Sequence, residues 1–182
     1  MTKDEKIAKL GKEITDRATV LLGKDKITPE SPEYLGINSA LKYTAYLYDQ
    51  KMADDILDIC LTMKKRVPLT IEQLAKKNPQ FDREYLEKAM QAVSESGLVE
   101  FHWENLDGKN PNHEKRWVLD MFVPGSAEIM MINPEQSDMY PETADFFERM
   151  AYLPLAGITE MVPPGGAGIG MHVIPVEKAI PA

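Results

Sequence analysis

The residues of this 182-residue chain that could do chemistry are few and far apart. It has one cysteine, Cys60, and three histidines, His102, His113 and His172. A structural zinc site takes four closely spaced cysteine or histidine ligands, and an iron–sulfur cluster normally takes four thiolates. Because the histidines are scattered and no His-x-x-x-His pair occurs, we expect no metal site within this chain.

Cys60 lies in a stretch whose apolar residues recur at helical spacing. Positions i, i+3, i+4 and i+7 are apolar, which predicts a helix over Ala53–Lys65 with Cys60 on its buried face beside Ile56, Ile59 and Met63. A buried thiol is inert and packs as a small apolar group. We therefore assign Cys60 a packing role rather than a reactive one.

Two clusters of like side chains invite a functional interpretation. Three aspartates, Asp54, Asp55 and Asp58, could ligate a metal, but negative charge in the first turns of a helix is explained by the helix dipole. A helix predicted over Ser39–Gln50 carries Tyr43, Tyr46 and Tyr48. They could stack on a base or a flavin, but aromatic packing with the hydroxyls reaching water is the simpler interpretation.

A glycine-rich run, residues 165–170, has only part of the pattern of a dinucleotide-binding loop. Such a loop follows a strand, opens a helix, and precedes an acidic residue by about 20 positions. This run follows Val162-Pro163-Pro164, precedes a proline-punctuated segment, and has no acidic residue at that distance. We interpret it as a flexible connection. Since no nucleophile with a base in reach is recognisable either, we predict neither a catalytic nor a cofactor-binding residue in this chain.

The first 52 residues are predicted to form helices that pack on the rest of the chain. Thr2 and Glu5 have the spacing of a capping box, and an apolar stripe continues to Leu22. We expect a helix over Lys3–Leu22, then a turn-rich connection, and then the helix over Ser39–Gln50.

Residues 53–122 have the element order of a winged helix-turn-helix. Thr70 and Gln73 have capping-box spacing at the start of a short helix, and Asp82 caps a longer helix that Gly97 closes. Two stretches of alternating polarity, joined by a long loop, follow at once and predict a hairpin. The order of helix, short helix, longer helix and hairpin predicts a winged helix.

The apolar side chains of the hairpin predict its register. Pairing Trp103 with Trp117 places Phe101 opposite Leu119 and Val99 opposite residue 121, so that one face is apolar throughout.

Residues 123–182 are predicted to be a helical and then extended segment, which makes the fold mainly α (α+β) with an irregular C-terminal extension. A turn at 123–125 leads to a short apolar segment, Ala127–Ile132, and a helix is expected to begin at Tyr140-Pro141-Glu142. Pro154 ends that helix, and Val173-Ile174-Pro175-Val176 suits only an edge strand because proline cannot donate to a ladder.

The charge balance argues against nucleic-acid binding. The chain has 21 basic and 29 acidic residues, a net charge of −8, whereas nucleic-acid binding depends on phosphate neutralisation by Lys and Arg. The predicted recognition helix, Asp82–Gly97, has four acidic and two basic residues. The candidates for phosphate or partner contacts are basic residues outside that helix, namely Lys76, Lys77, Lys109, Lys115 and Arg116.

Several short runs resemble one group of proteins. They are Phe122-Val123-Pro124-Gly125, Met130-Met131-Ile132-Asn133, Tyr140-Pro141-Glu142, Phe146-Phe147-Glu148 and the stretch Val173–Ile180. With the predicted winged helix, they resemble the N-terminal region of anaerobe oxidoreductases that carry 4Fe-4S ferredoxin-type segments and a pyridine nucleotide-disulfide oxidoreductase part. The resemblance covers Ser31 to the end of the chain.

This resemblance implies a larger parent enzyme. Its 4Fe-4S cluster, FAD and NAD(P) would be bound by a C-terminal redox domain beyond Ala182, so that this chain would be a truncated N-terminal part with that domain as its partner. No cluster or flavin ligand of the family falls on the residues of this chain.

Three functions follow as hypotheses. The first is a non-catalytic docking or regulatory module of such an oxidoreductase, and the second is a DNA-binding transcriptional regulator. The third is an oligomerisation module, suggested by Met130, Met131, Met139 and Met161. No signal peptide and no apolar run of about 18 residues are present, so we expect a cytoplasmic protein without a membrane span.

Overall fold

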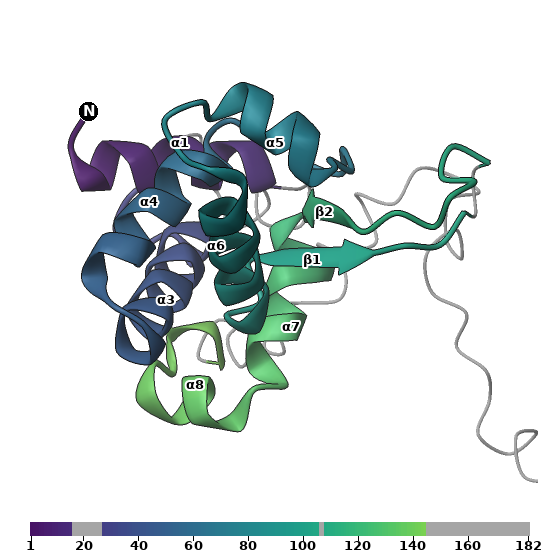
Figure 1. Ribbon diagram of the computed structural model, residues 1–182. Coiled ribbons are helices and arrows are strands. Elements are labelled where there is room, and N and C mark those ends of the chain that lie inside the picture. The colour runs from purple at the N-terminus through teal and green to yellow at the C-terminus, as the bar shows by residue number, and fades with distance from the viewer. Residues whose placement is uncertain (16–26, 106–107, 145–182) are drawn as a thin grey trace, which may run out of the picture. The chain divides into compact units, whose positions relative to one another are not determined.

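The computed structural model describes residues 1–15, 27–105 and 108–144, and Figure 1 shows their arrangement. The chain divides into two units, Met1–Phe146 and Phe147–Ala182. The second unit lies outside the described residues, as do the glycine-rich run, His172, and the expected strand at 173–176. The described part is mainly helical and contains one two-stranded antiparallel sheet. None of its helices is both long and apolar enough to cross a lipid bilayer.

Three helices begin where capping residues predict. Helix α1 (Lys3–Ile14) follows the Thr2 capping box, helix α5 (Ile71–Lys77) follows the Thr70 capping box, and Asp82 caps helix α6 (Arg83–Glu95). Each cap oxygen accepts a hydrogen bond from the backbone N–H three residues later, so an otherwise unsatisfied donor is paired. Helix α1 ends at Ile14, since the Thr15 backbone is extended with ψ of 149°, so the prediction of one helix continuing to Leu22 is wrong; residues 16–22 themselves lie outside the described residues.

The two helices between α1 and α5 begin and end earlier than predicted. Helix α3 (Pro32–Leu47) starts seven residues before Ser39 because Pro32 occupies the first helical position, where a proline is favoured. Helix α4 (Gln50–Cys60) starts at Gln50 because the Asp49 carboxylate accepts a hydrogen bond from the backbone N–H of Met52.

The earlier start of α4 corrects the interpretation of its aspartates. Asp54, Asp55 and Asp58 are not in the first turn, so the helix dipole does not explain them. Each pairs with a lysine instead, and two of these lysines, Lys3 and Lys6, come from α1. The aspartates therefore help to hold α1 against α4.

The core lies between α1, α3, α4 and α6, where α3 and α4 contact each other and both contact α1 and α6. Leu10, Ile37, Ile56 and Leu86, one from each helix, are fully buried. Cys60 is fully buried among them, which confirms its predicted place on the core face.

The hairpin follows α6 after Gly97, whose φ of +77° suits a glycine that ends a helix. Strand β1 (Val99–His102) pairs antiparallel with strand β2 (Arg116–Leu119), with Val99 opposite Leu119 and Phe101 opposite Trp117. The predicted register is therefore wrong by two residues, although a shift of two keeps the same side chains on the same face.

The segment before α5 explains why the register differs. The backbones of Leu69 and Trp117 exchange two hydrogen bonds of 2.9 and 2.8 Å, and the Arg66 N–H donates to the Leu119 carbonyl at 2.8 Å. These contacts fix β2 from its other side, and the chain turns after Leu119, where the Asp120 carboxylate accepts from the N–H of Met121. Met121 is therefore not available to pair with Val99.

Three short helical segments follow the hairpin. They are the π-helical turn η1 (Phe122–Ser126), helix α7 (Ala127–Met131) and helix α8 (Pro134–Met139). Helix α8 was not predicted, although Asn133 caps it and Pro134 occupies its first position. Phe122 is fully buried against Gly36 of α3, so η1 is anchored to the helical core. Residues 142–144 are helical, as expected after Pro141.

Candidate functional site

Helix α6 exposes an acidic surface beside the hairpin. Its exposed residues include Glu84, Glu87 and Glu95. The arginine in its first turn is already neutralised, because the Arg83 guanidinium lies 2.8 Å from the Glu72 carboxylate and 3.2 Å from that of Glu87. Lys88 is also exposed on α6, so this surface presents more negative than positive charge to a partner.

The five candidate basic residues lie on two parts of the fold, helix α5 and the hairpin with its loop. Lys76 and Lys77 are exposed in the last turn of α5. Lys109, Lys115 and Arg116 belong to the hairpin and its loop, where the Arg116 guanidinium donates to the Lys109 carbonyl at 2.6 Å. Two of the five side chains, Lys115 and Arg116, thus bind within the chain.

Lys115 is held by two aromatic rings and an amide. Its Nζ lies 3.9 Å from the ring centre of Phe101 and 4.3 Å from that of Trp117, and it donates to Gln91 Oε1 at 3.2 Å. A cation over an aromatic face is attracted by the ring quadrupole. These contacts hold the hairpin against α6. They also engage the positive charge of Lys115, which a phosphate contact would need.

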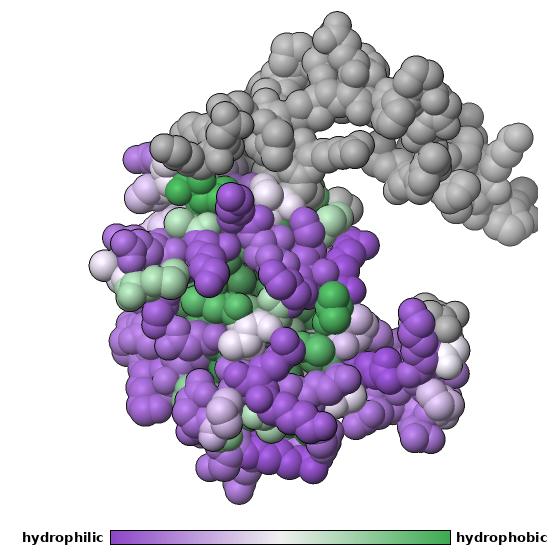
Figure 2. Space-filling view, turned by 90° about the horizontal axis from the view of Figure 1, so that it is seen from above, coloured by the Kyte–Doolittle hydropathy of each residue, from purple (hydrophilic) through white to green (hydrophobic). Residues whose placement is uncertain are grey.

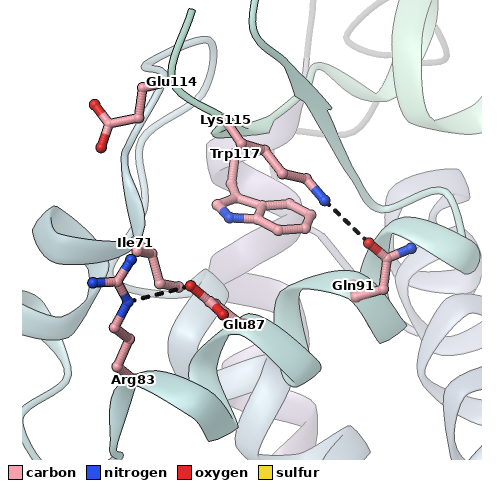
Figure 3. A pocket seen from close by; sticks show the side chains of 7 residues that line it. All are labelled: Ile71, Arg83, Glu87, Gln91, Glu114, Lys115 and Trp117. Carbon is pink, nitrogen blue, oxygen red and sulfur yellow. Dashed lines mark hydrogen bonds and ion pairs between the residues drawn. The ribbon is translucent and has the colours of Figure 1, made fainter. Parts of the chain in front are cut away.

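A groove of about 450 Å³ opens between α6 and the hairpin (Figure 3). We call it the α6–hairpin groove, and its lining residues are Ile71, Arg83, Glu87, Gln91, Glu114, Lys115 and Trp117. Its apolar residues are Ile71 and Trp117, and the others are polar or charged.

A second cavity, of about 240 Å³, lies on the polar face of the hairpin. Arg66, Glu100, His102 and Asp120 line it together with Pro68 and Val118. Arg66 has a left-handed backbone, with φ of +58°, and its Nε lies 3.2 Å from Asp120 Oδ1. Burial, with a smaller effect of the Asp120 charge, raises the pKa of the Glu100 carboxyl.

Within the described ranges, no three His, Cys, Asp or Glu side chains are grouped so that they could hold a metal ion. His102 lies near Glu104, and the His113 ring lies 3.1 Å from the Trp103 carbonyl, so these histidines do not converge. The chain does not fit an iron–sulfur cluster, because its single cysteine is fully buried.

The predicted cluster of three tyrosines packs within the fold, and its hydroxyls donate hydrogen bonds to carboxylates. The rings of Tyr43 and Tyr46 stack with centres 6.1 Å apart, and both hydroxyls donate to Glu135 of α8. Tyr48 donates to Glu95 of α6 at 2.8 Å. The hydroxyls thus join helices rather than only reaching water, and the rings are paired with each other.

One end of the described unit exposes most of its large apolar side chains. Of the nine that are exposed in the described part, six lie at the C-terminal end of α3 and on α7 and α8, at the lower end of Figure 1. We call this group the apolar end: Tyr46, Leu47, Tyr48, Met131, Ile132 and Met139. Ile132 is 79% exposed and Tyr46 55%. The opposite end, seen from above in Figure 2, is mainly hydrophilic over its described residues.

Sequence reasoning found only part of the apolar end. The methionines of residues 130–139 were singled out, but Met130 is buried while Met131 and Met139 are exposed. Tyr46 and Tyr48 were assigned to packing, and Leu47 was not singled out, since the proximity of Tyr46 to α8 depends on a contact between residues 89 positions apart. The sequence offered one signal of this exposed surface: the apolar residues Met131 and Ile132 directly precede Asn133 and Pro134, which begin α8.

Comparisons with known proteins do not assign the chain to a family. No family model matches it, and neither a curated protein nor a solved structure gave a match. The functional proposal below therefore depends on the surfaces of the described residues.

Proposed function

We propose that this chain is a non-catalytic winged-helix docking module, and that it docks onto an iron–sulfur flavoprotein oxidoreductase of the kind its sequence resembles. The element order of α4, α5, α6 and hairpin supports the winged-helix assignment. So does the bridge between Leu69 and Trp117, which joins the segment before α5 to the hairpin in one unit.

The apolar end is the observation that carries the docking function. Solvent-exposed apolar side chains scattered singly are ordinary, but a group of them at one place marks a protein interaction site. Here six of them gather on three elements that contact one another, with Ile132 almost fully exposed. The carboxylate of Glu135, held by two tyrosine hydroxyls, supplies a polar edge to this surface.

A DNA-binding regulator is the second candidate, favoured by the same element order. Against it stand the exposed carboxylates of α6 and the pairing of Arg83 with Glu72 and Glu87. A recognition helix reads base edges mainly with Arg, Lys, Asn and Gln, and phosphates repel carboxylates. The docking function therefore has the better support.

The docking proposal is tested by titrating the chain with the cofactor-loaded redox domain of an oxidoreductase from the resembling group. We expect saturable binding by calorimetry, and we expect Ile132→Asp to raise the Kd at least about tenfold, since a charge in the centre of an apolar interface is left desolvated. Because Ile132 is 79% exposed, this substitution leaves the fold intact.

Val67→Asp is the matched control, since Val67 is also exposed but lies outside the apolar end. We expect it to leave the Kd unchanged. Absence of binding, or equal loss with both variants, would overturn the proposal. Sedimentation of the chain alone tests the oligomerisation hypothesis. If the chain forms a dimer that Ile132→Asp dissociates, the apolar end binds a second copy of the chain instead of a redox domain.

A further inference from the structure

We propose that the apolar end binds a partner surface in which apolar side chains are bordered by lysine or arginine. This inference deepens the proposed function and rests on it for the place of contact. It adds the charge of the partner, which the exposed carboxylates beside the apolar end select.

Two exposed carboxylates are held at the edge of the apolar end by tyrosine hydroxyls. Glu135 of α8 accepts a hydrogen bond from Tyr46 at 3.3 Å and from the neighbouring Tyr43 at 2.8 Å. Glu95 of α6 accepts one from Tyr48 at 2.8 Å. Both glutamates are exposed. An ionised carboxylate has about four acceptor sites, so each of them can also bind a cation that a partner supplies.

The helices that carry most of the apolar end contain acids and no bases. Between Arg116 and Arg149 the sequence has no lysine, arginine or histidine, and α7 and α8 both lie within this stretch. Asp138 adds another exposed carboxylate on α8. The surface that these two helices offer to a partner is therefore apolar and acidic.

The lysines that flank the tyrosines in the sequence are engaged by other groups. Lys42 Nζ lies 3.7 Å from the Glu142 carboxylate and 5.5 Å from the ring centre of Tyr140. Lys51 binds Asp55 one helical turn further along α4. Within the described part of the chain, no ion pair therefore neutralises the carboxylates at the edge of the apolar end.

This distribution of charge disfavours two other occupants of an apolar surface. A second copy of the chain in a twofold dimer would bring the same carboxylates together, and like charges across an interface are unfavourable. An anionic lipid surface would be repelled in the same way. A protein surface with an apolar centre and a basic border matches both parts of the apolar end, and such charge complementarity favours association and selects the partner.

The test titrates the full chain with the peptide acetyl-Lys-Leu-Ala-Lys-Leu-Ala-Lys-Lys-Leu-Ala-Lys-Leu-Ala-Lys-amide. Its leucines recur at helical spacing between lysines. The matched peptide has glutamate in place of every lysine. We expect the lysine peptide to shift the methyl signals of Met131, Ile132 and Met139 in NMR spectra, since all three side chains are exposed at the apolar end. The glutamate peptide should leave these signals unchanged.

Glu135→Gln and Glu95→Gln should each raise the Kd of the lysine peptide about two- to fivefold, the range of an exposed ion pair. Glu84→Gln is the matched control, because it removes one exposed carboxylate near the opposite end of α6 and changes the net charge equally. It should leave the Kd nearly unchanged. A general attraction between an acidic chain and a basic peptide would respond alike to all three substitutions, and that result would overturn the inference. So would equal methyl shifts with the two peptides, or no shift at Ile132.

The same variants separate this inference from the proposed function. If the lysine peptide binds as expected but the redox domain does not, the proposed partner is wrong and the basic border stands. If the redox domain binds with a Kd that neither Glu135→Gln nor added salt alters, the docking site stands and the basic border is wrong, because exposed ion pairs are screened by salt.

Discussion

Burial raises the pKa of two side chains, Cys60 and Glu100. Cys60 is fully buried, and this raises the pKa of its thiol to about 12, so it stays protonated and unreactive at neutral pH. Helical periodicity alone predicted this environment. Glu100 is half-buried on the polar face of the hairpin, and its pKa is raised by burial and by the nearby Asp120. Nothing in the sequence pattern indicated that effect.

Glu100→Gln should stabilise the protein at neutral pH. A carboxyl whose pKa is raised above its usual 4.5 binds its proton more tightly in the folded state, so its ionisation destabilises the fold as the pH rises through and above that value. Glutamine removes this cost. In urea denaturation, we therefore expect the variant to have the higher midpoint at pH 7 and to lose that advantage near about pH 3.5, where Glu100 is protonated in both states.

Glu84→Gln serves as the comparison, since it removes one carboxylate from an exposed position on α6. If Glu100→Gln lowered the midpoint at pH 7, or if its effect were the same at both pH values, the Glu100 charge would not be destabilising.

At the scale of elements, local capping decided where three helices begin, and contacts between elements decided the rest. The starts of α1, α5 and α6 depend on hydrogen bonds across three residues, so the sequence was enough to predict them. The junction of η1 with α3 depends instead on Phe122 and Gly36, which are far apart in the sequence. A Cβ atom at position 36 would overlap the Phe122 ring.

Phe122→Ala should destabilise the protein by about 3–5 kcal/mol, the range for removing a large aromatic side chain from a core. Phe122 is fully buried, and its removal leaves a cavity against α3 that Gly36 has no side chain to fill. Urea denaturation followed by circular dichroism measures the change. Val67→Ala, at an exposed site, should stay within about 0.5 kcal/mol of the wild type. A loss below about 1 kcal/mol for Phe122→Ala would mean that η1 is not anchored in this way.

At the scale of the whole molecule, the distribution of charge separates the proposed functions. The net charge is −8, and the exposed surface of α6 adds carboxylates where a DNA-reading helix would carry bases. Lys76 and Lys77 lie on α5 and the other three candidate bases on the hairpin and its loop, where Arg116 and Lys115 already bind within the chain. We therefore expect only weak electrostatic attraction to a duplex, even at low salt where screening is smallest.

We expect no binding to a random duplex of about 20 base pairs at about 20 mM salt, the condition that most favours phosphate contacts. Fluorescence anisotropy of a labelled duplex measures this directly. A combined Glu84→Lys and Glu95→Lys variant is the positive control, because it reverses two exposed charges on α6 and should bind weakly and with strong salt dependence. Salt-dependent binding by the unaltered chain would support the regulator instead.

The sequence by itself determined the features that depend on neighbouring residues. Capping pairs such as Thr70 and Gln73 act across three residues, and the periodicity around Cys60 acts across two helical turns. The alternation of the hairpin likewise fixed which side chains share a face, although not the register.

Only the tertiary structure decided the register, the α6–hairpin groove and the apolar end. Each depends on residues that the fold brings together from distant positions: Leu69 beside Trp117, Gln91 beside Lys115, and Tyr46 beside Glu135. The engagement of Lys115 by Gln91 follows from those contacts. A sequence pattern records the spacing of residues along the chain, whereas these surfaces arise from packing between elements.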